Sequence, residues 1–501
     1  HKNNWGADVK FEWPRVIKAL AETGVVIGWP LGVWGLVTWF ETPPQLTVFI
    51  ALGFLFIADK LFKFQAVLPI MTRMMTGGVY DIANIEYNSY SLVTNTTPME
   101  AYRGAGRPEA TAAIERTIEM FAQACGLDST EVRRKNYIKP SAFPLTTSMG
   151  AAYDSGEYEK ALDMALTASG YQALRAEQKA RRDRGDVVQI GIGVASYVET
   201  TNPMGSGEYG AVEITNDGGA IVRTGSSSHG QGHHTSWAMI VSQKTGIPMD
   251  KIEFRFGDTD DIERGNGTGG SRSLQVGGTA AQMAAENVIE IARQKAADLL
   301  EAAPEDVVLD AATGAFHVVG SPRPSKTWAE IAIASPVALF AEADFTPEGA
   351  TFPFGTHVSV VEVDTETGSV AIVRHIACDD AGTILNPLIV DGQVHGGVAQ
   401  GIAQALLEEV RYDDGGNPIT SNLADYAFIT AAELPSFERI PMETPTPRNP
   451  LGAKGIGEAG TIGATPAVHN AVIDAVHHLG VQHIDMPCTA NRVWAALQSV
   501  R

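Results

Sequence analysis

Cysteine and positive charge are both scarce in this chain of 501 residues. The three cysteines, Cys125, Cys378 and Cys488, lie far apart and form no C-x-x-C spacing, so neither a disulfide framework nor a self-contained zinc or iron–sulfur site is indicated. Lysine and arginine number 37 against 58 acidic residues, and the formal net charge of -21 would repel a phosphate backbone. We therefore expect no nucleic-acid partner, and any iron–sulfur cluster to sit on another chain.

Two long runs that are both uncharged and strongly apolar lie near the N-terminus. Residues 23–40 and 42–58 carry no charge, and each run approaches the length that crosses a bilayer. Basic residues flank the pair on both sides, which by the positive-inside tendency places both ends on the cytoplasmic side. An apolar helical hairpin is therefore expected at 1–64, contacting a membrane through residues 16–63. The alternative is a buried hairpin of a soluble protein, so the expected location is the cytoplasm or the cytoplasmic side of the inner membrane.

A helix is expected at residues 108–126, PEATAAIERTIEMFAQACG. Proline occupies a first-turn position, Glu109 lies near the positive end of the helix, and Gly126 follows the last apolar residue. One face of this helix carries the apolar side chains Ile114, Ile118, Phe121 and Cys125.

A charged stretch at 177–186 precedes an alternating apolar run at 187–198, which indicates a domain boundary. The expected parts are therefore the hairpin of residues 1–64, a first domain at 65–187 and a second at 188–501.

A weak internal repeat follows this boundary. Residues 212–223 and 361–374 each read as a β-hairpin, and each leads through a segment with glycine and glutamine into an expected helix, at 230–241 and 392–409. Two α+β units of similar build are the simplest account. Two unrelated hairpins are the alternative.

Glycine is frequent, with 51 residues, and it gathers in turns that precede expected helices. These turns are RGAGRPEA at 103–110, HGQGHHT at 229–235, GTGGSRS at 267–273 and KGIGEAGTIGATPA at 454–467. They let backbone N–H groups approach an anion, although ordinary capping would explain a single one. The Walker pattern and the dinucleotide-fold glycine spacing are absent from the sequence. Four such turns favour a large phosphate-bearing ligand held by many loops.

Glu458 is the one carboxylate in GAKGIGEAGT, residues 452–461, where nearly every other residue is small. A carboxylate without bulky neighbours can reach a ligand, as a general base must. The structural alternative is that Glu458 interacts with the dipole of the helix that follows it. Histidines 229, 233 and 234 suggest a zinc site as an alternative, but the sequence places no carboxylate near them, as a metalloprotease needs.

Five segments resemble the molybdopterin-binding large subunit of the molybdenum hydroxylases, a family of aldehyde oxidoreductases, xanthine dehydrogenases and carbon monoxide dehydrogenases. They are AYRGAGRPEA (101–110), GQGHHTSWAMIVSQKTGIP (230–248), GTGGSRSLQVGGTAAQMAAENV (267–288), VHGGVAQGIAQALLEE (394–409) and PLGAKGIGEAGTIGATPAVHNAV (450–472). The resemblance runs from about residue 66 to the C-terminus, and residues 1–64 do not share it. It implies an α+β fold in which molybdopterin-binding domains are built from repeated mixed α/β units.

The resemblance also implies roles for single residues. Glu458 matches the catalytic base, and no protein side chain binds the molybdenum, because the pterin holds it. The residues that match cofactor contacts are Arg103, His229, Gly230, Gln231, Gly270, Ser271, Ser273, Gln400 and Gly457.

The implied reaction oxidises an aldehyde or similar small carbon substrate with water as the oxygen source. The cofactor is a molybdenum molybdopterin in the cytosine dinucleotide form. An iron–sulfur small subunit and usually a flavin (FAD) subunit would join in a hetero-oligomer with a dimeric large subunit.

The sequence departs from the family in three places. The loop AYRGAGR lacks the cysteine through which carbon monoxide dehydrogenases bind copper, and Ala105 replaces an aromatic residue of purine-oxidising members. The glycine-rich segment that precedes this loop in the family is missing. The first departure disfavours carbon monoxide as the substrate, and the second favours an aldehyde or another small substrate. The alternatives that stay open are a carbon monoxide dehydrogenase-like subunit, an inactive or incomplete scaffold and a membrane-anchored nucleotide-binding protein.

Overall fold

The computed structural model describes residues 67–92 and 94–500. The apolar hairpin expected at 1–64, with its membrane contact through residues 16–63, lies outside the described residues. None of the helices in the described part combines the length and hydropathy that crossing a bilayer requires.

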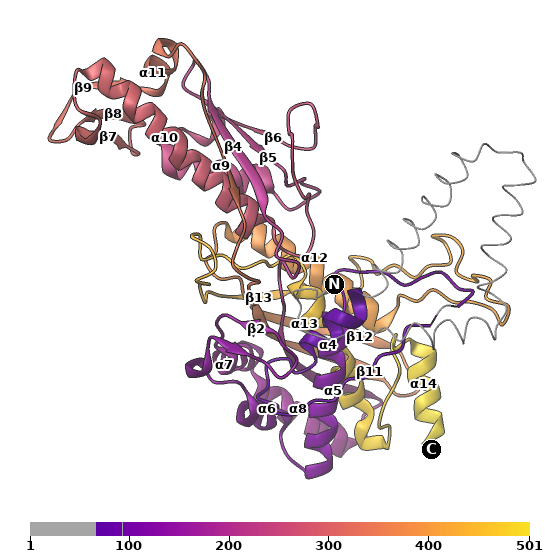
Figure 1. The fold of residues 1–501 in the computed structure, drawn as a ribbon. Coiled ribbons are helices and arrows are strands. Elements are labelled where there is room, and N and C mark those ends of the chain that lie inside the picture. The colour runs from indigo at the N-terminus through magenta and orange to yellow at the C-terminus, as the bar shows by residue number, and fades with distance from the viewer. Residues whose placement is uncertain (1–66, 93, 501) are drawn as a thin grey trace, which may run out of the picture. The chain divides into compact units, whose positions relative to one another are not determined.

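One four-stranded sheet has the strand order β10–β4–β5–β6 (Figure 1). The strands are β4 (Glu208–Ile214), β5 (Ala220–Thr224), β6 (Ile252–Arg255) and β10 (Leu339–Phe345). β4 and β5 form an antiparallel hairpin, and β6 adds parallel to β5 after the helix α9 (His233–Thr245).

The second sheet has the order β13–β12–β11–β3. Its strands are β3 (Val188–Val198), β11 (Phe354–Asp364), β12 (Val370–Asp380) and β13 (Glu438–Met442). β11 and β12 form an antiparallel hairpin, and β13 adds parallel to β12 after the helix α12 (Pro387–Leu406). Both sheets thus contain a hairpin, a connecting helix and a parallel strand, which confirms the predicted pair of similar units.

β3 precedes the first sheet in the sequence but belongs to the second. It pairs antiparallel with β11 along its whole length, from Val198 opposite Phe354 to Val188 opposite Asp364. Residues 199–353, which contain the first sheet, therefore form one long excursion between two neighbouring strands.

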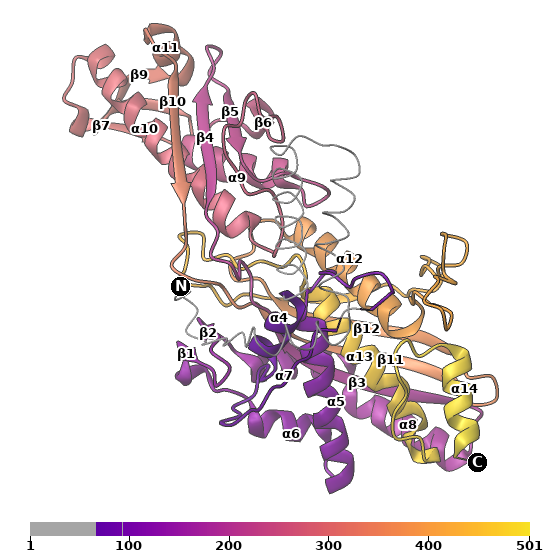
Figure 2. The ribbon, with the colours of Figure 1, turned by 45° about the vertical axis from the view of Figure 1, so that its right-hand side comes forward.

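Helices cover one face of the first sheet (Figure 2). They are α9 and α10 (Thr279–Leu300), and the short α11 (Trp328–Ala334) packs on α10. A three-stranded ribbon lies beside them, made of β7 (Val307–Asp310), β8 (Ala315–Val318) and β9 (Ser321–Thr327). The shared core contains Val212, Val222, Trp237 and Phe316, all fully buried.

The second sheet is covered on both faces. The helix α13 (Ala459–Val476) lies on one face beside α12, and α7 (Tyr158–Ser169) lies on the other. Glycine allows α13 to approach its neighbours closely: a Cβ atom added at Gly193 of β3 would lie 2.0 Å from the carbonyl oxygen of Ala467. A Cβ added at Gly397 of α12 would lie 3.0 Å from the Cα of Gly460. Part of the glycine content therefore serves helix packing.

The segment before β3 packs on the second sheet. Its elements are α4 (Val67–Met75), α5 (Arg107–Cys125), α6 (Ser129–Asn136), β1 (Leu145–Thr146), β2 (Ala152–Tyr153), α7 and α8 (Tyr171–Arg184), while α14 (Ala490–Ser499) closes the chain. The charged stretch at 177–186 lies mostly in α8. The boundary predicted between 187 and 188 falls at the start of β3, and residues on its two sides, such as Tyr158 and Ile192, share one core.

The predicted helix at 108–126 is confirmed as α5, which ends at Gly126 in the left-handed conformation. Its buried face, however, differs from the expected apolar face. Phe121 is 53% exposed and Cys125 is exposed, whereas Glu115 is fully buried. A buried carboxylate needs a charged partner, which α6 supplies.

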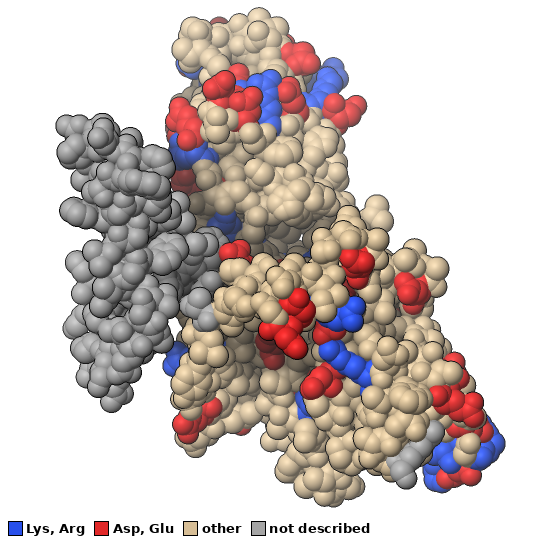
Figure 3. All heavy atoms as spheres, turned by 90° about the vertical axis from the view of Figure 1, so that its right-hand side faces the viewer, with Lys and Arg blue, Asp and Glu red and all other residues tan. Residues whose placement is uncertain are grey.

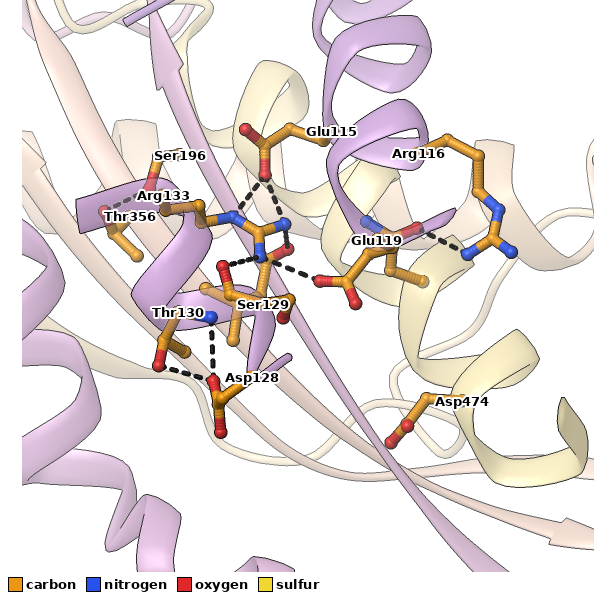
Figure 4. A network of polar contacts seen from close by, with 12 residues as sticks. Glu115, Arg116, Glu119, Asp128, Ser129, Thr130, Arg133, Ser196, Thr356 and Asp474 are labelled. Carbon is orange, nitrogen blue, oxygen red and sulfur yellow. Dashed lines mark hydrogen bonds and ion pairs between the residues drawn. The ribbon is translucent and has the colours of Figure 1, made fainter. Parts of the chain in front are cut away.

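That partner is Arg133, itself fully buried (Figure 4). Its guanidinium lies 2.7 Å from Glu115 and 2.8 Å from Glu119, and it also donates a hydrogen bond to the carbonyl oxygen of Val194 in β3. The network joins α5 to α6 by ion pairs and α6 to the second sheet by a hydrogen bond.

Surface charges are interspersed. In several places on the face shown in Figure 3, Lys and Arg side chains lie next to Asp and Glu side chains. Many of them pair; for example, Arg264 lies 2.8 Å from Asp344 at the edge of the first sheet.

Candidate active site

A cavity of about 570 Å³ is lined by segments that are far apart in the sequence. The ten residues given a catalytic or cofactor role from the sequence all line it: Arg103, His229, Gly230, Gln231, Gly270, Ser271, Ser273, Gln400, Gly457 and Glu458. The structure thus brings the four glycine-rich turns to one place. The roles of the single residues stay predictions.

Four helical segments begin at this cavity. α9, α12 and α13 start after Gly232, Asn386 and Glu458, and a π-helical turn, Leu274–Gly278, leads into α10 after Ser273. Each helix start presents backbone N–H groups and partial positive charge. Their convergence makes the cavity suited to a ligand with several anionic groups.

Glu458 stands immediately before α13 and its side chain does not cap that helix. Its Oε1 accepts a hydrogen bond of 2.9 Å from the backbone N–H of Gly104. Its Oε2 lies 2.6 Å from Nη2 of Arg107 and accepts a bond of 2.8 Å from the hydroxyl of Ser271. With 14% of its side chain exposed, the carboxylate is held firmly but reaches the cavity.

The surroundings of Glu458 favour its ionised form. Burial on its own would raise the pKa of the carboxyl. The charge of Arg107 and the hydrogen bonds from Gly104 and Ser271 outweigh burial, so the pKa of Glu458 is lowered from its usual value. The group is therefore ionised at neutral pH and able to accept a proton.

Small residues before Glu458 allow two loops to touch. A Cβ atom added at Gly455 would lie 1.7 Å from the carbonyl oxygen of Ser271, and one at Gly457 would lie 3.3 Å from the Ser271 hydroxyl. The segment 454–458 therefore rests directly on the backbone of 267–273. After Glu458, Gly460 and Gly463 serve the packing of α13, since added Cβ atoms would meet Val394 and His357.

Arg103 ties three segments of the cavity wall together. Its Nε donates to the carbonyl oxygen of Gly457 at 2.6 Å, and Nη1 donates to the side-chain oxygen of Gln400 at 2.9 Å. Nη2 donates to the carbonyl oxygen of Gln393 at 3.1 Å. Both Arg103 and Gln400 are thus oriented by protein contacts.

The turn before α9 is held by one of the predicted amides. The backbone N–H of His229 donates to Oε1 of Gln231 at 2.8 Å. Behind this turn, Nδ1 of His233 and Nε1 of Trp237 are buried without a hydrogen-bond partner among the described residues, and both residues line the cavity. Such atoms are costly unless a ligand or water satisfies them.

His233 is neutral at physiological pH. Burial, with a contribution from His229, lowers its pKa to about 4. Its ring therefore offers a hydrogen-bonding group instead of a charge. Within the described residues, no group of three His, Cys, Asp or Glu side chains is arranged to hold a metal ion.

Two buried charged residues of the site were not predicted. Arg107 contacts both Glu458 and Glu199, and Glu199 follows β3 with no exposed surface. The sequence holds a signal for each. Arg107 is the first residue of α5, where its charge opposes the helix dipole, and Glu199 ends an uncharged run of twelve residues, 187–198.

The sequence matches a known protein family. Two family models of the molybdopterin cofactor-binding domain match the chain, one at residues 164–435 and one at residues 58–137. The chain belongs to the molybdopterin cofactor-binding domain family. The predicted resemblance is thereby confirmed.

Relatives of this chain are named as subunits of enzymes with different substrates. The carbon monoxide dehydrogenase large chain of Hydrogenophaga pseudoflava is 39% identical over 84% of this chain and 55% of its own. The nicotine 6-hydroxylase large subunit of Paenarthrobacter nicotinovorans is 33% identical over 84% of this chain and 54% of its own. The chain spans about half the length of the relatives it matches.

Solved structures of relatives share the fold. Quinoline 2-oxidoreductase from Pseudomonas putida 86 superposes with a TM-score of 0.80 at 34% identity, covering 87% of this chain and 57% of its own. The Cu,Mo-containing carbon monoxide dehydrogenase superposes with a TM-score of 0.75 at 37% identity, covering 80% and 53%. The predicted α+β fold of repeated units is confirmed.

Proposed function

We propose that this chain is the cofactor-binding part of a molybdenum-dependent hydroxylase that oxidises an aldehyde or similarly small carbon substrate. The observation that carries the proposal is the position of Glu458. It is an ionised carboxylate on the wall of a cavity at which four helical segments begin. Water is the oxygen source, so an aldehyde and water yield a carboxylic acid, two electrons and two protons.

The cavity residues fit a molybdenum molybdopterin in its cytosine dinucleotide form. The helix starts at Gly232 and Ser273 would face its phosphates, and Gln231 and the unpaired Nδ1 of His233 and Nε1 of Trp237 would meet its polar edges. Gly270, Ser271 and Ser273 add contacts on the phosphate side. When bound, the group supplies water activation and accepts the two electrons.

The residues of this chain accept a proton and hold the accepting carboxylate in position. Glu458 accepts one proton from the water that attacks the substrate carbon, as a general base. Arg107, the Gly104 N–H and the Ser271 hydroxyl hold both carboxylate oxygens in place. Arg103 fixes the carbonyl oxygen of Gly457 beside the base.

Carbon monoxide is a less favoured substrate although two of the relatives named above oxidise it. The cavity lining contains no cysteine among the described residues. In the loop that approaches Glu458, Gly104 has a φ of +107°, and an added Cβ would lie 2.4 Å from the ring of Pro108. A copper-binding side chain does not fit this backbone conformation.

Electrons must leave through other subunits. The three cysteines are dispersed, two being buried in cores and one exposed at the end of α5, so this chain offers no cluster site. We therefore include an iron–sulfur small subunit and a flavin subunit in the proposal, assembled with a dimeric large subunit. The names of the relatives, a large chain and a large subunit, support a multi-subunit assembly.

Substitution of Glu458 tests the proposal. In the complete enzyme, purified with its natural partner subunits, Glu458→Gln should lower aldehyde turnover by about a hundredfold or more, because a general base contributes that much. Molybdenum and cytidine nucleotide content should stay at the wild-type level. Glu131→Gln, at a carboxylate that is 59% exposed on α6, is the control and should change neither quantity.

Two outcomes would contradict the proposal. Wild-type turnover in a metal-replete Glu458→Gln enzyme would show that Glu458 is not the general base. A wild-type enzyme without molybdenum would instead favour an inactive scaffold.

A further inference from the structure

Glu199 is a second carboxylate beside the proposed base. It follows the last residue of β3, where its backbone N–H donates to the carbonyl oxygen of Pro353 at 2.8 Å, and its side chain has no exposed surface. Oε1 of Glu199 lies 3.4 Å from the same Nη2 atom of Arg107 that lies 2.6 Å from Glu458. One guanidinium nitrogen therefore faces two carboxyl groups at unequal distances.

The unequal distances indicate which carboxyl carries the charge. Glu458 receives the short contact with Arg107 and two further hydrogen bonds. Glu199 has the longer contact with Arg107 and interacts in addition with the side chains of Glu458 and Ser271. Its Oε2 is buried, and no donor among the described residues lies within hydrogen-bonding geometry of it. An ionised carboxylate with one oxygen unpaired in a closed site is costly, whereas a protonated one gains a donor at that oxygen.

Among the described residues, the groups that influence Glu199 most belong to this site. Glu199 is faced by Arg107 on α5, Arg103 on the preceding loop, Glu458 before α13, Tyr197 on β3 and the hydroxyl of Ser271. Burial is the largest influence and the charge of Glu458 the next, and together they raise the pKa of Glu199 to about 8 despite Arg107.

We infer that Glu199 is a positioning residue that keeps its proton at neutral pH and points it towards Glu458, so that Arg107 balances the charge of Glu458 alone. The inference rests on the proposed function only for the role of Glu458 as base. A neutral Glu199 leaves one negative charge in the site and adds a donor to the carboxylate that must stay ionised. Two carboxyl groups this close do not both ionise readily.

Infrared titration of the complete enzyme tests this inference, because the C=O stretch of a protonated carboxyl is distinct from the bands of a carboxylate. The wild-type enzyme should lose one such band with a midpoint near pH 8. Glu199→Gln should abolish that step and leave the other carboxyl bands in place. Glu458→Gln should move it to lower pH, because the negative charge that disfavours ionisation of Glu199 is gone. The exposed control Glu131→Gln should leave it unchanged.

Each result decides the inference. Absence of a protonated carboxyl at pH 7 in the wild type, or a step that survives in Glu199→Gln, would overturn it. If Glu199→Gln fails to fold, the wild-type titration and the direction of the shift in Glu458→Gln still decide it. An enzyme with the predicted titration but no aldehyde turnover would contradict the proposed function alone, and one with turnover but no such band would contradict this inference alone.

Discussion

Nη2 of Arg107 lies 2.6 Å from Oε2 of Glu458, and these two residues stand at the starts of two different helices, α5 and α13. A positive charge at a helix start is unfavourable unless an anion lies beside it. The pair therefore explains both the unusual place of Arg107 and the low pKa of Glu458. It also connects the loop at 101–107 with Glu458.

Removal of the guanidinium should change the pH dependence of the reaction. In Arg107→Met, the pKa of Glu458 should rise, because the cation that favours its charged form is lost. The acid limb of a plot of kcat/KM against pH should therefore move to higher pH. Arg184→Met, which breaks a surface pair with Asp186, should leave the limb in place. An unchanged limb in Arg107→Met would show that the ion pair does not set the ionisation of the base.

A methyl group between the two touching loops should disturb cofactor binding. In Gly455→Ala the new Cβ would meet the carbonyl oxygen of Ser271, which is backbone and cannot turn away, so the 267–273 loop must shift. We expect the purified enzyme to contain much less molybdenum and cytidine nucleotide. Gly349→Ala is the control, because its Cβ would lie 3.6 Å from the nearest atoms of Arg448. Full cofactor content in Gly455→Ala would mean that the contact between the loops is dispensable.

The buried network of Figure 4 should matter for stability and not for chemistry. Arg133→Met would leave Glu115 and Glu119 without their cation, at a cost of about 3–5 kcal/mol in the free energy of unfolding. Thermal unfolding would detect this as a large drop in melting temperature. The surface substitution Arg184→Met should cause little change. A melting temperature close to wild type in Arg133→Met would show that the two carboxyl groups become protonated or find other partners.

Glu199 should make stability depend on pH in a defined window. Its folded pKa of about 8 lies above the ordinary value of 4.5, so the folded state keeps a proton that the unfolded state has released between these values. The folded state binds more protons there, and stability falls as pH rises, by at most about 1.4 kcal/mol per pH unit. Glu199→Gln lacks this loss, so its melting temperature relative to wild type should rise from pH 4.5 to 8 and level off above. A constant difference would show that Glu199 does not titrate in this window.

The sequence was sufficient to predict the convergence of the cavity residues. Glycine turns before helices have a recognisable pattern, and their match to one family fixed which turns meet. The role of glycine in helix packing was not predicted, because nothing in the sequence shows that Gly193 lies against the carbonyl oxygen of Ala467.

Charged residues in the interior were harder to predict. Glu115 and Glu119 occupy positions of α5 that look solvent-exposed from composition, while Phe121 looks buried and is not. Their placement depends on Arg133, which reaches them from another helix. The positions of Arg107 and Glu199 in the site were not predicted for the same reason, because the sequence does not show which charged residues become neighbours in the folded chain.

The pairing of β3 with β11 constrains how the protein is made. Val198 and Phe354 are neighbours in the sheet but 354 − 198 = 156 residues apart in the chain. At about 5–20 residues per second, the ribosome needs roughly 8 to 30 seconds to supply the partner strand. During that interval a strand with ten of its eleven residues destined for the interior is open to aggregation. Synthesis of this chain should therefore depend on chaperones that shield the nascent polypeptide until the second hairpin emerges.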